Sequence, residues 1–557
     1  MPKLSKSKIS MVLMSLLFPF VMSSVLAQQT QTAGSTPQEL VKQAREALAQ
    51  EKFLIAADFY LRLANLEKTN ADHFYNAACA FAMAGQIDSA FLWLDKSIQN
   101  GYIDLDHLKK DTDLRSLNQD ARWDKTIANL SAKIRQDARL WDSEVWKIPY
   151  SDQLSEEQRI GGLAKLWSEV KYGFVFTQTL NEIDWDAQFL NFLPRVKAAR
   201  STDQYYRELM TMAALLKDGH TRVIPPKELL DQSYAMPLLR ANVIEDRVIL
   251  TEVADELLRS QGLRVGMEVL KLNNVDVKTY LQENVAPLLS ASTSQDMQRR
   301  LYQSQFLMGP LTQKVMLTVQ DQGGKSSQWE ATRYDTKTRA QLMPSLPAFS
   351  WRMLDDQVVY VALNSFANET VARDYFAAFP DIAKAKAMIV DLRKNGGGNG
   401  SVGYKILSTL ADRSFDVGAS TTRDYKPAMR AWGRPEMPFT FETRKIPADT
   451  KFHFDGKVVV LSSAQTYPAA EDFLLAFDTM KRGRIVGEVS GGSTGQPLVI
   501  NLPGGGMATI VSKHDTYPDG KAFVGVGIQV DQQISPKLKD FRSNRDTVLE
   551  AAVQTLK

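Results

Sequence analysis

The sequence predicts a multidomain α+β protein. Three sequence patterns indicate this: helical periodicity with small residues as far as 217, short β-rich runs over 236–335, and strands that alternate with helices from 346 onward. A chain of 557 residues is too long for one core, so several domains are expected. Hydrophobic residues make up 44% and charged residues 24%, which excludes a wholly fibrous or disordered chain.

The first 27 residues have the pattern of a secretory signal peptide. Three lysines precede an apolar run at 11–25, and small residues allow cleavage after Ala27. An uncleaved anchor is the alternative, but a run of about 15 residues is short for a membrane span of about 20. No cysteine follows the run, which disfavours a lipoprotein. We therefore expect residues 1–27 to be removed and the protein to be periplasmic or extracellular.

Charge and metal-ligand patterns exclude several function classes. Without the three lysines of the signal segment the formal charge falls from +3 to zero, so nucleic acid is not an expected partner. The single cysteine, Cys79, cannot form an internal disulfide and lies in an apolar helical run, where packing is its expected role. The five histidines show no HxH or HExxH spacing, and no CxxC occurs. Neither a metal nor a cofactor is predicted.

Residues 36–135 are predicted to form helix pairs. In FYNAACAFAMAGQIDSAFLWL the small and apolar residues follow the order of a tetratricopeptide repeat, and Ala56 precedes Ala90 by 34 residues, the period of that repeat. One repeat is clear and its neighbour is degenerate. Such a short array can bind a protein partner in a groove, or it can be a structural cap, which is the role that we favour.

A second helical region, a cap, is predicted over 150–230. It contains three amphipathic stretches, the last with Ser201 before its apolar face as an N-cap. This region ends at the motif DGHT, which contains His220.

Residues 231–340 are predicted to form a small β domain. The runs NVIEDRVILTEV and QKVMLTVQDQ flank GLRVGMEVLKLNNVDVKTYL. This order of strands, glycines and an Asn-Asn turn resembles the end of a PDZ domain, of the permuted kind found in bacterial proteases; another small β-sandwich is the alternative. A PDZ fold binds chain termini by adding them to a sheet edge.

Residues 345–557 are predicted to form an α/β layer. Strands such as AMIVDLR and KVVVLSS alternate with helices at 369–384, 401–411 and 468–481. In such a layer, site residues lie at the carboxyl ends of the strands.

Four stretches in this order resemble the tail-specific (C-terminal processing) serine peptidase family, in the branch similar to the tricorn core and the interphotoreceptor retinoid-binding protein. They are LKDGHT, VDLRKNGGGNG, VVVLSSAQTYPAAEDF, and IVGEVSGGSTGQP with PDGKAFVGVGIQVD. The resemblance covers about 155–535. It implies a ClpP/crotonase-like core at 345–557 and a hydrolase that cleaves polypeptides near their C-termini.

The resemblance also implies roles for individual residues. His220 matches the general base, which suits a histidine because its ordinary pKa is about 6.5. The glycines of NGGG can aim backbone amides at an anion, and one oxyanion donor is expected at Gly397, with Gly396 as the alternative. The second donor matches Ala469, at a helix N-terminus.

The nucleophile position is occupied by Pro468. The family pattern has serine there, whereas this chain reads TYPAAE. Proline suits the first residue of a helix, so the scaffold should tolerate it while acyl transfer should not. Thr466 and Ser463 are too far upstream to replace the missing hydroxyl.

The remaining catalytic positions also depart from the family. The lysine base of the other branch is matched by Ser493, and Val524 stands where some members carry glutamate. Glu488 and Asp531 are the candidates for a third triad member, although a salt bridge or a cap explains either equally well.

We therefore expect a secreted serine-type peptidase homologue that acts on or binds polypeptides near their C-termini with weak or absent activity. The alternative is a non-catalytic peptide-binding pseudoprotease. A third possibility is an assembly protein that uses the helical repeats, but it leaves the motif VDLRKNGGG unexplained.

Overall fold

The computed structural model describes residues 36–68, 70–355, 357–493 and 495–557. The chain divides into two units, residues 1–141 and 142–557. The segment predicted as a signal peptide lies outside the described residues. Among the helices that are described, none combines the length and the apolar run needed to cross a bilayer.

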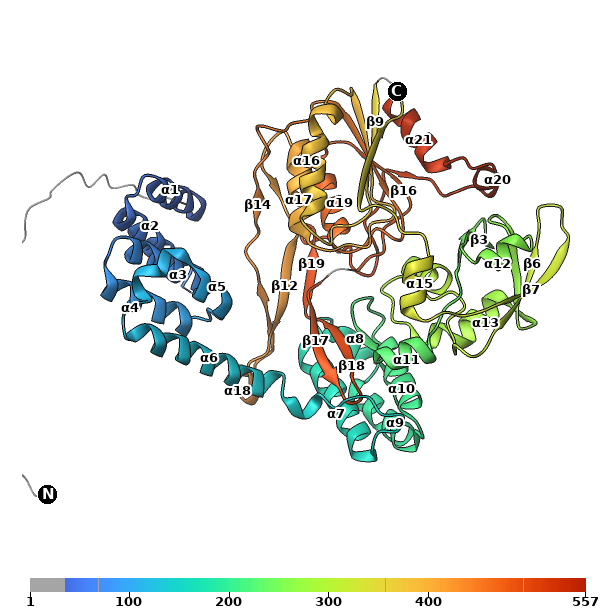
Figure 1. Ribbon diagram of the computed structural model, residues 1–557, viewed down its shortest axis with the longest axis horizontal. Helices are drawn as coiled ribbons and strands as arrows, with labels where there is room; N and C mark the ends of the chain where they lie inside the picture. Colours follow the sequence, from blue (N-terminus) through green and yellow to red (C-terminus); the bar gives the residue numbers. More distant parts are fainter. Residues whose placement is uncertain (1–35, 69, 356, 494) are drawn as a thin grey trace, which may run out of the picture. The chain divides into compact units, whose positions relative to one another are not determined.

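The first unit is a series of helices in which α1 to α4 each pack on the next, and the 3₁₀ turn that follows α5 packs back on α3 (Figure 1). The helices are α1 (Pro37–Ala49), α2 (Phe53–Leu66), α3 (Ala71–Met83), α4 (Ile87–Gln99), α5 (Leu105–Lys110), a 3₁₀ turn (Thr112–Leu117) and α6 (Arg122–Trp141). The starts of α1 and α3 lie 34 residues apart, as do those of α2 and α4. Ala56 and Ala90 are fully buried, so small residues stand where the helices approach closely.

The second unit begins with a helical bundle that packs on a small sheet. The helices are α7 (Glu156–Gly173), α8 (Thr177–Glu182), α9 (Trp185–Ala198) and α10 (Thr202–Ala214). The sheet has the order β1-β18-β17, with β1 (Arg222–Ile224), β17 (Pro497–Leu502) and β18 (Gly506–Val511). Leu209 and Ile510 belong to one buried core, so a hairpin from the end of the chain completes the bundle.

An antiparallel sheet of order β2-β3-β4-β6-β7 follows, and β2 is one of its edge strands. Its elements are α11 (Lys227–Gln232), β2 (Leu239–Ile244), β3 (Arg247–Val253), α12 (Glu256–Ser260), β4 (Glu268–Leu272), β5 (Val275–Asp276), α13 (Val277–Asn284), a 3₁₀ turn (Ala286–Leu288), α14 (Ser294–Arg299), a π turn (Arg300–Ser304), β6 (Val315–Gln320), β7 (Ser326–Ala331) and α15 (Thr336–Leu342). Buried and half-buried residues alternate along β6, because one face of the sheet meets its own core.

A six-stranded sheet of order β20-β16-β15-β10-β9-β8 forms the last layer. All neighbours are parallel except β8 and β9. The strands are β8 (Phe349–Met353), β9 (Val358–Leu363), β10 (Ala387–Asp391), β15 (Lys457–Ser462), β16 (Arg484–Gly487) and β20 (Gln532–Gln533), and the helices are α16 (Thr370–Ile382), α17 (Gly400–Leu407), a 3₁₀ turn (Ser408–Leu410), α19 (Ala469–Met480), α20 (Leu538–Arg542) and α21 (Thr547–Leu556).

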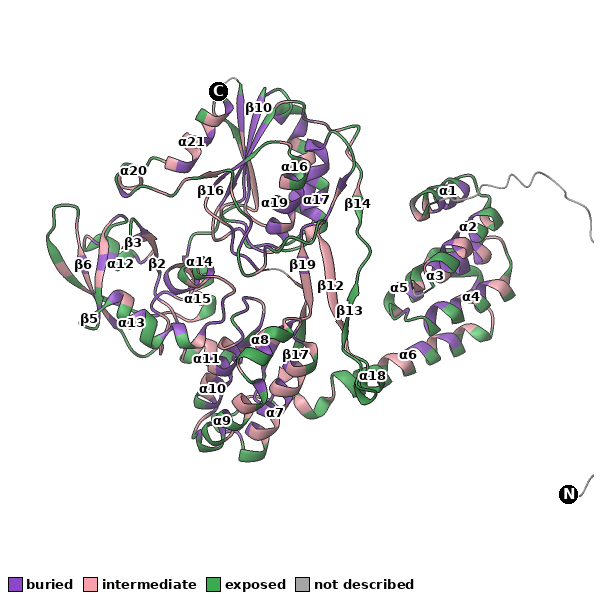
Figure 2. Ribbon diagram, turned by 180° about the vertical axis from the view of Figure 1, so that it is seen from behind, coloured by how far each residue is buried: buried purple, intermediate pink, exposed green. Residues whose placement is uncertain are grey.

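Helices cover both faces of this sheet. The helices α16, α17 and α19 share one core with it, and α21 shares another on the opposite face (Figure 1). Every residue of β10 is buried, as Figure 2 shows, because parallel strands at the centre of such a layer have no exposed face. The parallel direction brings the carboxyl ends of β9, β10, β15 and β16 to one edge.

Shorter strands extend from this layer. They are β11 (Phe415–Asp416), β12 (Ala419–Asp424), β13 (Met437–Thr440), β14 (Lys445–Ile446) and β19 (Lys513–Thr516), with α18 (Pro427–Ala431). They form a pair, β11-β14, and a sheet of order β13-β12-β19. The whole is a mixed helix-and-sheet fold.

Candidate active site

Three of the predicted site positions line one small cavity at the carboxyl edge of the six-stranded sheet. The cavity has a volume of about 310 Å³, and His220, Gly396 and Pro468 contribute to its wall. They come from the turn before β1, the loop after β10 and the start of α19. The sheet topology explains this meeting, since loops that follow neighbouring parallel strands end at the same edge.

Pro468 lies where the loop after β15 becomes α19. Its φ of −41° and ψ of −58° are helical. Its carbonyl accepts the amide of Asp472 at 2.9 Å, so the first turn of the helix forms normally. Proline has no N–H to donate, and the first residues of a helix have no intrahelical acceptor for one. Proline at this position is therefore compatible with the backbone of the helix start, and it carries no hydroxyl.

The turn that carries His220 is fixed by the buried carboxylate of Asp218. Its Oδ1 accepts the amides of His220 at 3.0 Å and Thr221 at 2.7 Å. Burial raises the pKa of Asp218 to about 6 although these bonds oppose the rise. A Cβ at Gly219 would lie 1.8 Å from Tyr467 Oη, so only glycine allows the turn to approach this close.

The imidazole of His220 is held on two sides. Its Nδ1 lies 2.7 Å from Ser493 Oγ, and the ring stacks on Tyr467 with 5.4 Å between centroids. Among the described residues Nε2 has no hydrogen-bond partner, which leaves that nitrogen available to a hydroxyl or a ligand. Burial, followed by the charges of Arg300 and Arg222, lowers the pKa of His220 to about 4. The ring is therefore neutral near pH 7, the form that accepts a proton.

Ser493 is positioned by Glu471, one turn into α19. Glu471 has no exposed surface and accepts the hydroxyl of Ser490 at 2.5 Å and the amides of Gly492 at 2.7 Å and Ser493 at 3.2 Å. Burial raises the pKa of Glu471 to about 8, against the effect of these bonds. One carboxyl group thus ties the helix that begins after Pro468 to the loop that orients His220.

The loop after β10 places glycine backbone beside Pro468. A Cβ on Gly397 would lie 3.0 Å from Pro468 Cδ and 3.4 Å from the amide nitrogen of Ala469. The sequence favours Gly397 over Gly396 as an oxyanion donor, and the two amides have different surroundings in the structure. The amide of Gly397 donates to Asn395 Oδ1 at 2.9 Å, whereas Gly396 lines the cavity. Among the described residues, the amides of Gly396 and Ala469 donate to no acceptor.

The two upstream hydroxyls are used in the backbone of the site. Ser463 Oγ donates to the carbonyl of Arg393 at 2.6 Å, and Thr466 Oγ1 donates to that of Leu392 at 2.9 Å. Thr466 has no exposed surface. Both groups therefore hold the loop together and lie outside the lining of the cavity.

The acidic candidates for a third triad member make their contacts elsewhere. Asp531 Oδ2 accepts the amide of Ile485 at 2.7 Å, and burial raises the pKa of Glu488. In the described structure neither contacts His220, whose Nδ1 position is taken by Ser493. The structure thus brings together His220, Pro468, Gly396, Gly397 and Ala469, and leaves Glu488 and Asp531 apart.

Several cavity residues were outside the sequence prediction. Arg222, Arg299 and Arg300 line the cavity, from β1, from the last residue of α14 and from the first residue of the π turn that follows it. Arg300 is buried, binds Asp296 at 2.9 Å, and donates to Tyr467 Oη at 2.9 Å. The adjacent arginines of QRRLY, inside a region predicted to be an independent β domain, were the available signal.

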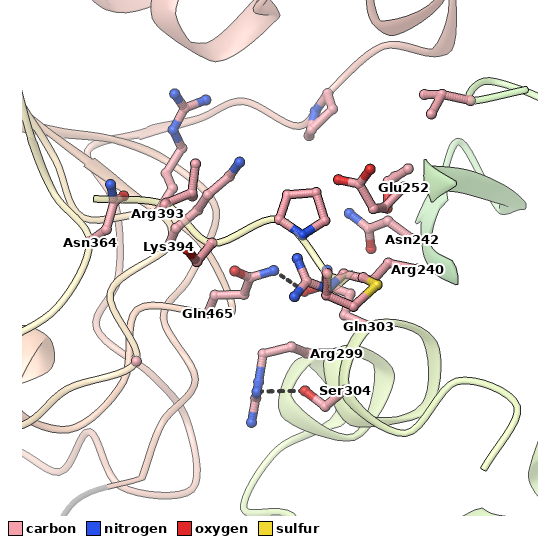
Figure 3. A pocket seen from close by; sticks show the side chains of 18 of the residues that line it. Arg240, Asn242, Glu252, Arg299, Gln303, Ser304, Asn364, Arg393, Lys394 and Gln465 are labelled. Atoms are coloured by element: carbon pink, nitrogen blue, oxygen red, sulfur yellow. Dashed lines mark hydrogen bonds between the residues drawn. The ribbon is translucent and has the colours of Figure 1, made fainter. Parts of the chain in front are cut away.

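A larger cavity of about 1200 Å³ adjoins the small one, because Arg299, Ser304 and Gly396 line both. Its walls come from β2 and β3 on one side and from the loops of the six-stranded sheet on the other (Figure 3). Gln303 and Gln465 are hydrogen-bonded to each other across it. Pro468 lines the small cavity and not the larger one.

Known peptidases resemble this chain in sequence and in fold. The model of peptidase family S41 matches residues 357–534. The chloroplastic C-terminal processing peptidase of Tetradesmus obliquus is 24% identical over 348 residues, 60% of this chain and 69% of that protein. A carboxyl-terminal-processing protease of Picosynechococcus sp. is 24% identical over 370 residues, 64% of this chain and 78% of that protein. The structure of mature CPAF complexed with lactacystin has a similar fold, with a TM-score of 0.56 and 13% identity over 70% of this chain and 95% of that chain.

Proposed function

With an S41 peptidase domain at residues 357–534 and a chain related to the tail-specific peptidases, we propose that the protein binds polypeptides near their C-termini and cleaves them weakly or not at all. The observation that carries this proposal is Pro468, which lines the same cavity as His220. Loss of the serine from a catalytic triad lowers turnover by about 10⁶, while binding and oxyanion stabilisation persist.

The surroundings of Pro468 support retained binding. His220 is oriented by Ser493, and two backbone amides near Pro468 have no acceptor among the described residues. The small cavity shares Arg299, Ser304 and Gly396 with a cavity of about 1200 Å³. In the proposal the β2–β7 sheet serves as a PDZ-like domain whose edge strand β2 faces the cleft, and residues 345–557 are the ClpP/crotonase-like core. An added peptide strand on β2 would direct a polypeptide toward Pro468.

A protease assay on four forms of the mature protein tests the proposal. Wild type and Pro468→Ala should not cleave a denatured protein substrate measurably, whereas Pro468→Ser should cleave it and react with a serine-directed phosphonate. Pro468→Ser/His220→Ala should lose that activity, because the hydroxyl needs the imidazole as its base. Efficient cleavage by wild type would overturn the proposal, and His220→Ala in the wild-type background would then show whether that cleavage uses this site.

Secretion is part of the same proposal. Cleavage after Ala27 would deliver the protein to the periplasm or the exterior. The intact mass of the protein from an exporting host measures it directly. A chain that retains residues 1–27 after fractionation would contradict this part alone.

The alternative role is a non-catalytic interaction scaffold that uses the helices of residues 36–135. The 34-residue offset between helix starts supports a tetratricopeptide-like array there. Deletion of residues 28–140 should then abolish capture of a protein partner while peptide binding in the cleft persists.

A further inference from the structure

The small cavity at Pro468 is lined by positive charge. Arg222, Arg299 and Arg300 contribute to its wall, and no aspartate or glutamate does so among the described residues. Asp296 lies behind the wall and binds both Arg299 at 2.7 Å and Arg300 at 2.9 Å. One carboxylate therefore faces two guanidinium groups, and Arg222 adds a third.

Arg222 is the arginine of this cavity that lacks a counter-ion. Its backbone pairs with Thr509 in the sheet, but its guanidinium group has neither a hydrogen bond nor an ion pair with any described residue, and the residue is exposed at the cavity. Surrounding protein and then the charge of Arg300 hold the pKa of Arg222 below its usual range. An anion in the cavity would relieve that repulsion and would supply the missing acceptor.

Backbone donors lie close to the same space. Gly396 lines the cavity, and Ala469 follows Pro468 at the N-terminus of the twelve-residue helix α19. Neither amide has an acceptor among the described residues. A guanidinium and two backbone amides form a donor set that suits a carboxylate, whose two oxygens can accept from both kinds of donor.

The larger cavity also has more basic than acidic residues in its lining. Its basic lining residues include Arg240, Arg339 and Lys394, and its acidic ones are Glu252 and Asp546. Asp546 pairs with Arg393 at 2.7 Å, and Arg393 also pairs with Asp391 at 2.6 Å, so the excess rests on Arg240, Arg339 and Lys394. Figure 3 shows Arg240, Lys394 and Arg393 around the space that leads toward Arg299. A chain that lies in this cleft would therefore meet an excess of positive charge along its length.

We propose that the small cavity binds the free C-terminal carboxylate of a polypeptide with an acidic tail, by means of Arg222 and the amides of Gly396 and Ala469. The tail then runs through the larger cavity. This proposal rests on the proposed function and adds its ligand class. In a working peptidase this space receives the substrate carbonyl that the serine attacks. Here Pro468 offers no hydroxyl for that attack, so a carboxylate of similar size can stay bound in the cavity.

Paired peptides test this assignment on the full mature protein. One peptide has an acidic tail and a free C-terminal carboxylate, and its partner has the same sequence with a C-terminal amide. We expect the free acid to bind about tenfold or more tightly than the amide, the usual effect of one charge-assisted contact. Replacing the acidic residues of the tail by glutamine should weaken binding further and reduce its dependence on salt.

Variants of two arginines assign the effect to the cavity. Arg222→Gln should bind the acid and the amide equally, whereas Arg222→Lys should keep part of the difference. Arg413→Gln is the matched control, because Arg413 is exposed, lines neither cavity and has no ion pair with any described residue. Thermal unfolding of each variant confirms that the fold persists.

The outcomes separate this proposal from the one on which it rests. If wild type binds both peptides equally, the carboxylate assignment fails and peptide binding stands. If the Arg222→Gln protein is folded and still prefers the acid, the assignment to this cavity fails. If neither peptide binds and no other C-terminal peptide binds, the proposed function itself fails. Inorganic phosphate that binds as tightly as the free acid would replace the polypeptide by a small anion.

Discussion

The residues at the two ends of the first turn of α19, Pro468 and Glu471, differ in the contacts that they make. At its beginning, Pro468 has helical backbone angles and its carbonyl accepts the amide of Asp472. One turn later, Glu471 accepts three hydrogen bonds from the loop that orients His220. The two positions therefore differ in structural role: Pro468 makes no side-chain hydrogen bond, whereas the carboxyl of Glu471 holds several buried partners.

This separation has a physical origin. A nucleophile must be exposed to substrate, so its loss costs little in packing or hydrogen bonding. A residue that positions the base is buried, and its loss leaves polar partners without water or protein to bind. A chain can therefore lose turnover in one step and keep a cleft that binds.

The largest effect on stability should come from Glu471→Ala. The substitution leaves one hydroxyl and two amides unsatisfied in a site with no exposed surface, so we expect a loss of about 3–5 kcal/mol in the free energy of unfolding. Denaturant unfolding measures it. Glu442→Ala, at an exposed position with no ion pair among the described residues, should change the value by less than about 0.5 kcal/mol. Equal losses of unfolding free energy in both variants would mean that the hydrogen bonds of Glu471 do not support the site.

A smaller effect should appear in the pH dependence of stability through His220. Its folded pKa of about 4 lies below the ordinary value of 6.5, so the unfolded chain binds more protons between those two values. The free energy of unfolding should therefore rise from pH 4 to pH 6.5. After a reduction for the partial exposure of the ring, we expect about 2 kcal/mol from this group.

The control for this prediction is His220→Gln, which does not titrate. The rise in wild type should exceed the rise in the variant over that window, measured by denaturant unfolding at fixed ionic strength. Parallel curves would mean that the ring is as well solvated in the folded protein as in the unfolded chain, and that its environment is not that of a prepared base.

The sequence predicts the individual helices, strands and turns of this fold better than the contacts between them. The apolar run before Ser462 and the proline at the start of the next helix predict β15 and α19 closely, because those signals are local. The DGHT turn and the glycine loop are likewise local patterns. Each contains the residues that its own backbone geometry requires, so each is recognisable without its neighbours.

The contacts between segments are different. The bond from Ser493 to His220 joins positions 273 residues apart, and nothing near either residue indicates the other. Arg300 donates to the carbonyl of Gly219 at 3.0 Å from within a region predicted as a separate domain. Such pairs depend on the packing of whole layers, and a local pattern cannot specify them. A local pattern likewise cannot decide between Gly397 and Gly396 as the oxyanion donor, because only the folded loop shows that Asn395 Oδ1 accepts the amide of Gly397.

The smallest expected effect distinguishes these two glycines. Gly397 has a φ of +100°, and a Cβ there would lie 3.0 Å from Pro468 Cδ and 3.2 Å from the carbonyl oxygen of Tyr467. A Cβ at Gly396 would meet open space, with nothing within 4 Å, and the φ of Gly396 lies outside the left-handed region. We expect Gly397→Ala to lower the free energy of unfolding by about 1 kcal/mol, while Gly396→Ala changes it by less than about 0.5 kcal/mol.

Peptide binding should show the reverse order for the same two variants, because the Cβ of Gly396→Ala enters the cavity whereas the amide of Gly397 is already occupied by Asn395. Titration of one C-terminal peptide against both variants measures this difference. A Gly396→Ala protein that binds as wild type does, beside a Gly397→Ala protein that is stable but no longer binds, would place the donor at Gly397 after all.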